Sequence, residues 1–159
     1  MSFLAKPAGT RRVVIDQITP SIEGGRHPFK RVVGDWVAFA AHAFADSHDL
    51  IQVELRIRKI NTESWQVFPM APLGNDEFKA TYRTDSIGLF EYEIAGVVDH
   101  YGSWYESFQK KHQEGVPLDL EYRIGAELLE QAAKRANKKH TAKLLEWAAQ
   151  LADSKADIR

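Results

Sequence analysis

The side chains that could perform metal chemistry are present in this chain, but their spacing forms no strong pattern. The six histidines include neither a His-x-His pair nor a His-Glu-x-x-His motif, which are spacings that metal sites use. The tightest group of possible ligands is Asp46, His48 and Asp49. A polar turn between two strands would contain the same residues, and we favour the turn over a metal site.

Hydrolytic and phosphate-binding signatures are also missing. Retaining glycosidases need two carboxyl groups about 5–5.5 Å apart, and no pair among the 22 acidic residues stands out. No serine lies in a Gly-x-Ser-x-Gly elbow, and Gly24-Gly25 lacks the strand–loop–helix setting of a phosphate-binding loop. The chain has no cysteine, which excludes a cysteine nucleophile and disulfides. We therefore expect no catalytic residue, metal or cofactor in this chain.

Aromatic side chains are the remaining candidates for binding. The apolar face of a sugar ring docks on a flat aromatic ring, and Trp65, at the head of a short predicted strand, is the best candidate for an exposed platform. Tyr101, Trp104 and Tyr105 form a second group where the predicted sheet meets the predicted helices. These residues could contact sugar or a partner domain, although large aromatics more often pack in a core.

A small basic group follows Gly24-Gly25. It consists of Arg26, Lys30 and Arg31. These side chains could bind a phosphate or an acidic partner surface, and a solvated turn is the simpler alternative. We keep Arg26 and Lys30 as candidate contact residues.

The composition limits the class of protein. The chain has 159 residues, of which 44% are hydrophobic and 27% charged, enough for one globular domain with a small appendage. The net charge of −1 gives no field to attract nucleic acid or an anionic membrane. We see neither a signal peptide nor a run of the roughly 20 apolar residues that a membrane span needs. We therefore expect a cytoplasmic protein without nucleic-acid or membrane partners.

The first two thirds of the chain predict strands. Residues 51–59 alternate apolar and polar side chains, the period of a strand with one solvent-facing side. Turn residues separate similar segments, as in an antiparallel β-sandwich. The expected strands are 12–19, 36–45, 51–59, 65–68, 77–84 and 88–98.

The last third predicts three helices. Ser103 and Glu106 have the spacing of a capping box, and the helix that they open should stop at Gly115. A second helix is expected over about 119–136, with Leu120, Ile124 and Leu128 on one apolar stripe that Tyr122, Leu129 and Ala133 broaden. A third is expected over about 140–152. The fold class is therefore α+β, mainly β: an antiparallel sandwich with a C-terminal helical appendage.

Several motifs along the chain occur together in one known family. They are Pro20, Gly24, Gly25, Arg26, Pro28, Lys30, Gly34 and Asp35; the turn Asp46-Ser47-His48-Asp49; Trp65, Pro69, Met70, Asn75 and Asp76; and VVDHYGSWYESFQKK at 97–111. Over residues 12–135 this combination resembles the N-terminal domain of the bacterial maltosyltransferases that extend α-1,4-glucans from maltose 1-phosphate, relatives of the α-amylases. Ser47 stands where that family usually has glycine.

The resemblance implies a domain organisation. The residue pattern predicts a flexible N-terminus (1–11), a β-sandwich (12–101) and a helical part (102–159), and the resemblance implies that the sandwich is immunoglobulin-like and that the helical part is an insertion. In that family another strand follows the insertion and completes the sheet. The resemblance therefore implies that the natural chain continues past residue 159.

The resemblance also implies a role. The family transfers maltose from maltose 1-phosphate to the non-reducing end of an α-glucan, with an Asp nucleophile and a Glu acid/base on a (β/α)₈ barrel. A barrel takes about 250 residues, so none of those groups is expected in this chain. The implied role is to pack on the catalytic barrel and to support a homodimer interface near the substrate site. The implied partners are the barrel, a second copy of the enzyme, and the α-glucan or maltose 1-phosphate that the parent enzyme binds.

Two other functions remain open at this point. The chain could be a glucan-binding module that holds oligosaccharide on exposed aromatics. It could also be a β-sandwich that binds other proteins through its edge strand.

Overall fold

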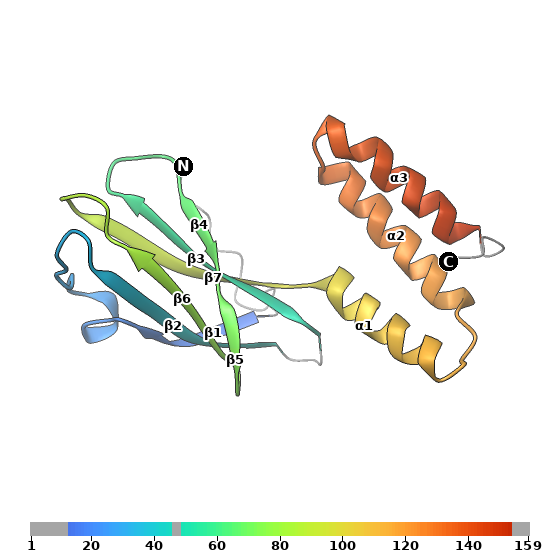
Figure 1. Ribbon diagram of the computed structural model, residues 1–159, viewed down its shortest axis with the longest axis horizontal. Coiled ribbons are helices and arrows are strands. Elements are labelled where there is room, and N and C mark those ends of the chain that lie inside the picture. Colours follow the sequence, from blue (N-terminus) through green and yellow to red (C-terminus); the bar gives the residue numbers. More distant parts are fainter. Residues whose placement is uncertain (1–12, 46–48, 154–159) are drawn as a thin grey trace. The chain divides into compact units, whose positions relative to one another are not determined.

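The structure, a computed structural model, describes residues 13–45 and 49–153. The chain divides into two compact units between Val98 and Asp99. The described strands lie in the first unit, and the second unit contains three described helices (Figure 1). This arrangement confirms the mainly β, α+β fold class. The lead-in expected over residues 1–11 lies outside the described residues.

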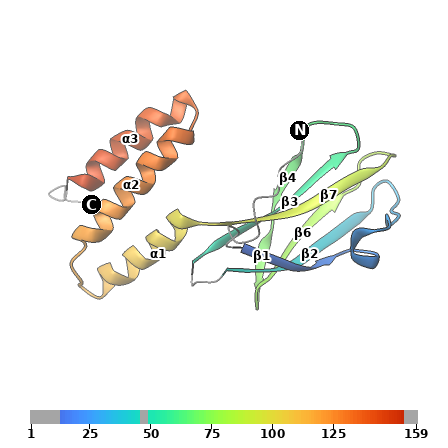
Figure 2. The same cartoon turned by 180° about the vertical axis from the view of Figure 1, so that it is seen from behind.

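The first unit is built from antiparallel strands. They are β1 Val13–Thr19, β2 Trp36–Ala45, β3 Ile51–Lys59, β4 Gln66–Pro69, β5 Ala71–Gly74, β6 Glu77–Arg83 and β7 Phe90–Val98. One sheet has the order β1-β2-β6-β5 and the other the order β4-β3-β7. Figure 2 shows the strands from behind. A short 3₁₀ turn, Glu23–Gly25, lies between β1 and β2.

The alternation of side chains explains why the two sheets pack face to face. In β3, Val53, Leu55 and Ile57 are buried, while the intervening side chains lie on the outer face. β2 and β6 alternate in the same way. Burying one such aliphatic side chain is worth about 1.5–3 kcal/mol. The buried core draws on both sheets: Val37, Phe39, Ala43, Val53, Leu55, Ile57, Met70, Phe78, Ala80 and Tyr82.

All six expected strands are present, and the structure adds a seventh, β5. This segment contains Pro72 and Gly74, two residues that strands normally avoid. Within the described part of the chain it pairs with β6 alone, at the edge of its sheet, and all four of its residues are exposed. An exposed edge strand has no buried side to produce alternation, so its sequence carries no strand signal.

The strand order has a counterpart among immunoglobulin domains. In those domains a sheet A-B-E-D faces a sheet with C, F and G, and variable-type domains add C′ beside C. Here β1-β2-β6-β5 follows the order A-B-E-D, and β4-β3-β7 follows C′-C-F. Among the described residues, no strand pairs with the outer edge of β7, the position that G occupies.

The second unit consists of α1 His100–Gln113, α2 Asp119–Arg135 and α3 Lys138–Ala152. A two-residue connection makes α2 and α3 a hairpin, and Ala126, Leu129 and Ala148 are buried between them. No described helix is both long and apolar enough to cross a membrane.

One large side chain holds α1 against α2. The indole Nε1 of Trp104 donates a hydrogen bond to the Glu121 carbonyl oxygen at 2.8 Å. The Trp104 ring lies over Gly125, where an added Cβ would come within 2.2 Å of a ring carbon. Lys111 forms an ion pair with the carboxylate of Glu121, whose side chain is almost fully buried. Glycine at position 125 is therefore required by the close approach of the indole.

The capping box expected at Ser103 is wrong. Helix α1 begins earlier, and Asp99 is its N-cap: the Asp99 carboxylate accepts a hydrogen bond from the Gly102 N–H at 2.8 Å. The Ser103 hydroxyl donates to the Asp99 carbonyl at 2.7 Å, as a first-turn residue would. Asp and Ser are both good N-caps, and in the structure the helix is capped by Asp99, the residue that directly follows the end of β7.

Only part of the apolar stripe expected on α2 is buried. Leu129 and Ala133 are buried, as expected, together with Ala126. By contrast, Leu120 and Ile124 are 56% and 36% exposed. Helix α2 is apolar around more than one face, and its periodicity alone does not say which face a neighbouring helix covers.

Candidate functional site

Trp65, the expected sugar platform, lies on the outer side of the sandwich and is half-buried. The Arg58 guanidinium lies over its ring, 4.2 Å from the ring centre. The Nε atom of Arg58 also donates to the Glu91 carboxylate at 2.5 Å. One face of the Trp65 ring is therefore covered by a cation that an acidic neighbour holds in position.

The outer face of β3 and β7 continues as a row of ion pairs. Arg56 donates to the Glu54 carboxylate at 2.7 Å through Nε and to the Glu93 carboxylate at 3.1 Å through Nη1. These hydrogen bonds, that of Glu54 first, raise the pKa of Arg56 above its ordinary value. Both arginines of this row are thus paired with carboxylates, so the row presents little unpaired charge to an anionic ligand.

The aromatic group at the start of α1 divides into one buried and two exposed members. Trp104 is part of the helical packing described above. Tyr101 and Tyr105 are 50% and 46% exposed. Their rings are nearly parallel, at 4° to each other, with centres 6.3 Å apart. The structure thus brings these three candidates together, away from Trp65 in sequence and in a different unit.

Arg26 and Lys30 lie in the segment between β1 and β2, and both are exposed. The Arg26 backbone N–H donates to Glu23 at the 3₁₀ turn. The neighbouring Arg31 donates to the Lys30 carbonyl at 2.7 Å and lies over the Phe29 ring. The segment is therefore a structured turn with an exposed basic rim, and the two candidates share it.

The sequence analysis missed the most exposed apolar surface of the sandwich, at the end where β2 begins and β6 ends. We call it the Trp36 end. Its exposed side chains are Val32 (71%), Val33 (49%), Trp36 (69%), Ile87 (86%) and Leu89 (65%). The signal was present: apolar residues flank Gly34 and Gly88, in loops where a soluble chain usually places polar residues.

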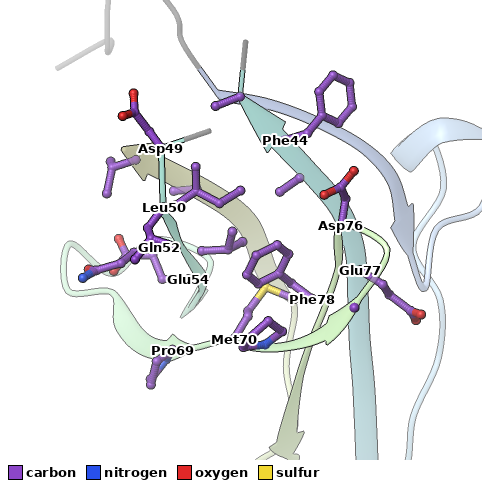
Figure 3. A pocket seen from close by; sticks show the side chains of 18 of the residues that line it. Phe44, Asp49, Leu50, Gln52, Glu54, Pro69, Met70, Asp76, Glu77 and Phe78 are labelled. Carbon is purple, nitrogen blue, oxygen red and sulfur yellow. The ribbon is translucent and has the colours of Figure 1, made fainter. Parts of the chain in front are cut away.

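A cavity of about 880 Å³ opens at the opposite end of the sandwich. Figure 3 shows Met70 and Phe78 in its centre, whereas the carboxylates of Asp49 and Glu77 point away from it. Among the described residues, no group of histidine and acidic side chains could hold a metal ion. Asp46 and His48, which the sequence analysis considered as metal ligands or as part of a polar turn, lie outside the described residues. Among the described residues, the cavity is a largely apolar opening between the sheets, with Met70 and Phe78 at its centre.

A larger groove of about 1500 Å³ runs along β7 and the segment between β1 and β2. Apolar side chains of both sheets line it, among them Phe39, Tyr92 and Ile94. The Tyr92 hydroxyl donates to the Pro20 carbonyl at 2.6 Å. The Tyr82 hydroxyl, also in the lining, is buried and has no hydrogen-bond partner among the described residues. Burial, and then the negative charge of Asp85, raise the pKa of Tyr82.

The geometry of the described residues does not identify a family, and comparison with known proteins does. The family model for "alpha-1,4-glucan:maltose-1-phosphate maltosyltransferase, domain N/S" matches residues 11–159. The maltosyltransferase of Chlorobaculum tepidum is 43% identical over 128 residues, which cover 80% of this chain and 19% of that protein. That of Methylacidiphilum infernorum is 33% identical over 150 residues, or 94% of this chain and 22% of that protein. That of Pseudomonas aeruginosa is 32% identical over 124 residues, or 78% and 19%.

The chain spans about a fifth of the length of these curated relatives. The resemblance inferred from the motifs is confirmed, because the match covers almost the whole chain. The chain therefore belongs to the α-1,4-glucan:maltose-1-phosphate maltosyltransferase family, to the region that the family model describes as domain N/S.

Proposed function

We propose that this chain is the non-catalytic N-terminal domain of a cytoplasmic maltosyltransferase that extends α-1,4-glucans from maltose 1-phosphate. The observation that carries the proposal is the match of the N/S family model to residues 11–159, together with relatives of which the matched region is only about a fifth. Its role is structural: it packs on the catalytic barrel of the parent chain and supports the homodimer. The glucan and maltose 1-phosphate are bound elsewhere in the parent enzyme.

The proposal includes an immunoglobulin-like sandwich interrupted by the helical unit. A later strand of the parent chain would pair with the outer edge of β7, in the position of strand G. The strand order A-B-E-D over C′-C-F supports this arrangement. So does the apolar groove along β7, because an unpaired and uncovered strand edge invites a further strand.

The homodimer role is supported by the surface of the helical unit. Large apolar side chains remain exposed on all three helices: Tyr101, Tyr105, Leu120, Ile124, Leu145 and Trp147. Exposed large apolar side chains on several helices of one unit are candidates for an interaction site. We assign this surface to contact with a second copy.

The dimer is tested with variants of α3 in the full-length polypeptide. Leu145→Asp together with Trp147→Asp should convert the dimer to a monomer in sedimentation experiments, because each places a charge in an apolar contact. Gln150→Asp, at another exposed position of α3, is the matched control and should leave the mass unchanged. An unchanged mass in the double variant would show that this surface of α3 is not part of the dimer interface.

The activity is tested by phosphate release. The full-length polypeptide should release phosphate from maltose 1-phosphate when an α-glucan acceptor is present, and the 159-residue chain alone should release none. Release by the short chain, or no release by the full polypeptide, would contradict the proposal.

A glucan-binding role is the second candidate, and one observation favours it. The parallel, half-exposed rings of Tyr101 and Tyr105 offer the kind of aromatic surface on which sugar rings dock. Titration with maltohexaose, followed through backbone amide shifts, would place binding at Tyr105 if this role is correct. The absence of shifts at millimolar sugar would leave the structural role alone.

A further inference from the structure

The Trp36 end carries an inference beyond the family role, although it rests on the proposed function. We propose that this end of the sandwich is the surface that docks the catalytic part of the parent polypeptide. The occupant is the remainder of the same chain, and its contacting surface is apolar.

The Trp36 end is an ordered surface rather than a pair of loose loops. Thr84 ties the two segments together: its N–H donates to the Asp35 carbonyl at 3.0 Å, and its hydroxyl donates to the Val32 carbonyl at 2.6 Å. The Gly34 N–H donates in return to the Thr84 carbonyl at 2.9 Å. The Val32 N–H is bonded to the Asp35 carboxylate at 3.1 Å.

The second loop is anchored to β3 as well. The Ile60 N–H donates to the Leu89 carbonyl at 2.9 Å, and the Lys59 ammonium donates to the Ile87 carbonyl at 3.1 Å. The backbone of this loop is therefore engaged inward, while the side chains of Ile87 and Leu89 remain outside. A loop held in this way presents its apolar side chains without first having to lose much conformational freedom.

The Trp36 end differs from a surface on which single apolar residues are scattered. Single exposed apolar residues are common on soluble proteins, but grouped ones mark interaction sites. Here the hydrogen bonds above hold Val32, Val33 and Trp36 beside the loop that carries Ile87 and Leu89. Trp36 itself begins β2, opposite Arg83 of β6, so its position is fixed by the sheet register.

The topology identifies the occupant. Strand β7 begins at Phe90, which pairs with Lys59 at the Trp36 end, and finishes at Val98, at the opposite end. A returning strand that pairs antiparallel with β7, as in the proposed arrangement, would start beside Val98 and finish beside Phe90. The parent chain would then leave the sandwich next to Ile87 and Leu89.

Membership of one polypeptide strengthens this choice. Linking two surfaces in one chain raises their effective concentration relative to that of a free partner. The region of the relatives outside the match is several times as long as this chain, which is enough for a complete catalytic barrel. The barrel is therefore the partner that arrives first at the Trp36 end, ahead of any free protein.

Hydroxyl-radical footprinting with mass spectrometry tests the proposal. The oxidation rate of Trp36 is compared between the 159-residue chain and the full-length polypeptide, with Phe44, near the opposite end of β2, as the internal reference. Docking should slow Trp36 oxidation about tenfold in the full polypeptide, while Phe44 changes less than twofold. Hydrogen exchange of the β7 amides, measured in parallel, reports separately on the proposed returning strand.

Variants make the test specific to the surface. Ile87→Lys with Leu89→Lys, made in the full polypeptide, should restore at least half of the lost Trp36 oxidation. Leu73→Lys, an exposed apolar position on β5, is the matched control and should restore none. Circular dichroism of the same variants in the short chain checks that the sandwich still folds.

The outcomes separate the two proposals. Protected β7 amides with an unprotected Trp36 would overturn the docking surface and leave the returning strand. If neither is protected, the proposed domain arrangement fails together with the docking surface. Trp36 protection that grows with the concentration of the short chain would identify a second copy as the occupant and overturn the assignment to the barrel.

Discussion

The two units of this chain are stabilised to very different degrees by their own side chains. The sandwich buries branched aliphatic and aromatic residues from both of its sheets, with Leu55 fully inaccessible. The buried cluster of the helical hairpin is Ala126, Leu129 and Ala148, with Leu144 and Leu151 partly covered. Small alanine side chains bury little area, and apolar burial is the main stabilising term in folding. The comparison indicates that the helical hairpin relies on fewer and smaller buried apolar side chains than the sandwich does.

Truncation of the sandwich core should give the largest effect. Leu55→Ala should lower the free energy of unfolding of the sandwich by about 3–4 kcal/mol, because it leaves a cavity where both sheets meet. Urea unfolding checks this value, and Leu73→Ala on the exposed strand β5 is the control, expected within about 0.5 kcal/mol of the parent. A Leu55→Ala loss under about 1 kcal/mol would break the comparison, since it would mean a loosely packed sandwich.

The helical unit should respond most strongly at the indole contact. Gly125→Ala would raise intrinsic helix propensity by about 1 kcal/mol, yet the new Cβ would collide with Trp104. We expect a net loss of about 1–3 kcal/mol, as for overpacked cores, visible as faster hydrogen exchange in α1 and α2. Pairing the change with Trp104→Leu should recover part of the loss. A stabilised Gly125→Ala variant would show that α1 does not depend on this contact.

The buried carboxylate of the helical unit should give an intermediate effect. Lys111→Met leaves the Glu121 carboxylate without its partner while its side chain is only 6% exposed. We expect a loss of about 1–2 kcal/mol, below the 3–5 kcal/mol of fully buried pairs, because the lysine side chain is 40% exposed and partly screened by water.

The neighbouring residue supplies the control for this ion pair. Lys110→Met breaks an exposed pair with Glu106 and should cost less than about 0.5 kcal/mol when both lysine variants are measured by thermal unfolding. Equal losses from the two lysines would mean that the burial of Glu121 contributes nothing.

The pH dependence of the stability of the sandwich tests the burial of two tyrosines. Burial raises the pKa of Tyr82 above its ordinary value of 10.0, and burial also raises that of Tyr92. Because the pKa is raised in the folded state, the tyrosine hydroxyl of the unfolded chain loses its proton first as the pH rises. The stability that the two protonated tyrosines contribute is therefore fully present below pH 10 and is lost as the pH rises above it.

The corresponding variant should give the smallest effect at neutral pH. Tyr82→Phe removes a buried hydroxyl that has no hydrogen-bond partner among the described residues, so we expect it to be neutral or stabilising by up to about 1 kcal/mol. Its stability should also fall less steeply above pH 10. A clear loss at pH 7 would imply a hydrogen bond from this hydroxyl, for which the nearby Asp85 carboxylate is the candidate.

Local patterns predicted most elements, and the failures have identifiable causes. The strand 51–59 has a buried side and a solvent side, so alternation locates it; β5 is exposed at all four residues, shows no alternation and escaped detection. The capping signal at Ser103 is a real local preference, but Asp99 supplied a competing cap four residues earlier. The family motifs were specific enough to identify the family before any fold was known.

Candidate surfaces could be predicted less well than elements. The exposed platform was expected at Trp65, whose ring the structure places under Arg58, whereas Trp36 is the tryptophan with the larger exposed fraction. Alternation places Trp36 on one face of β2, but it does not say whether another sheet covers that face. Whether an aromatic is exposed depends on neighbours from distant segments.

The sequence by itself determined the order of elements, the mainly β, α+β class, the family, and the absence of cysteine chemistry, because these depend on residue type and short-range spacing. The tertiary structure alone decided which strands share a sheet, that the outer edge of β7 is open among the described residues, and which face of α2 is covered. It also gathered Val32, Trp36 and Ile87 on one surface. These features arise from contacts between residues far apart in the chain, which local periodicity cannot encode.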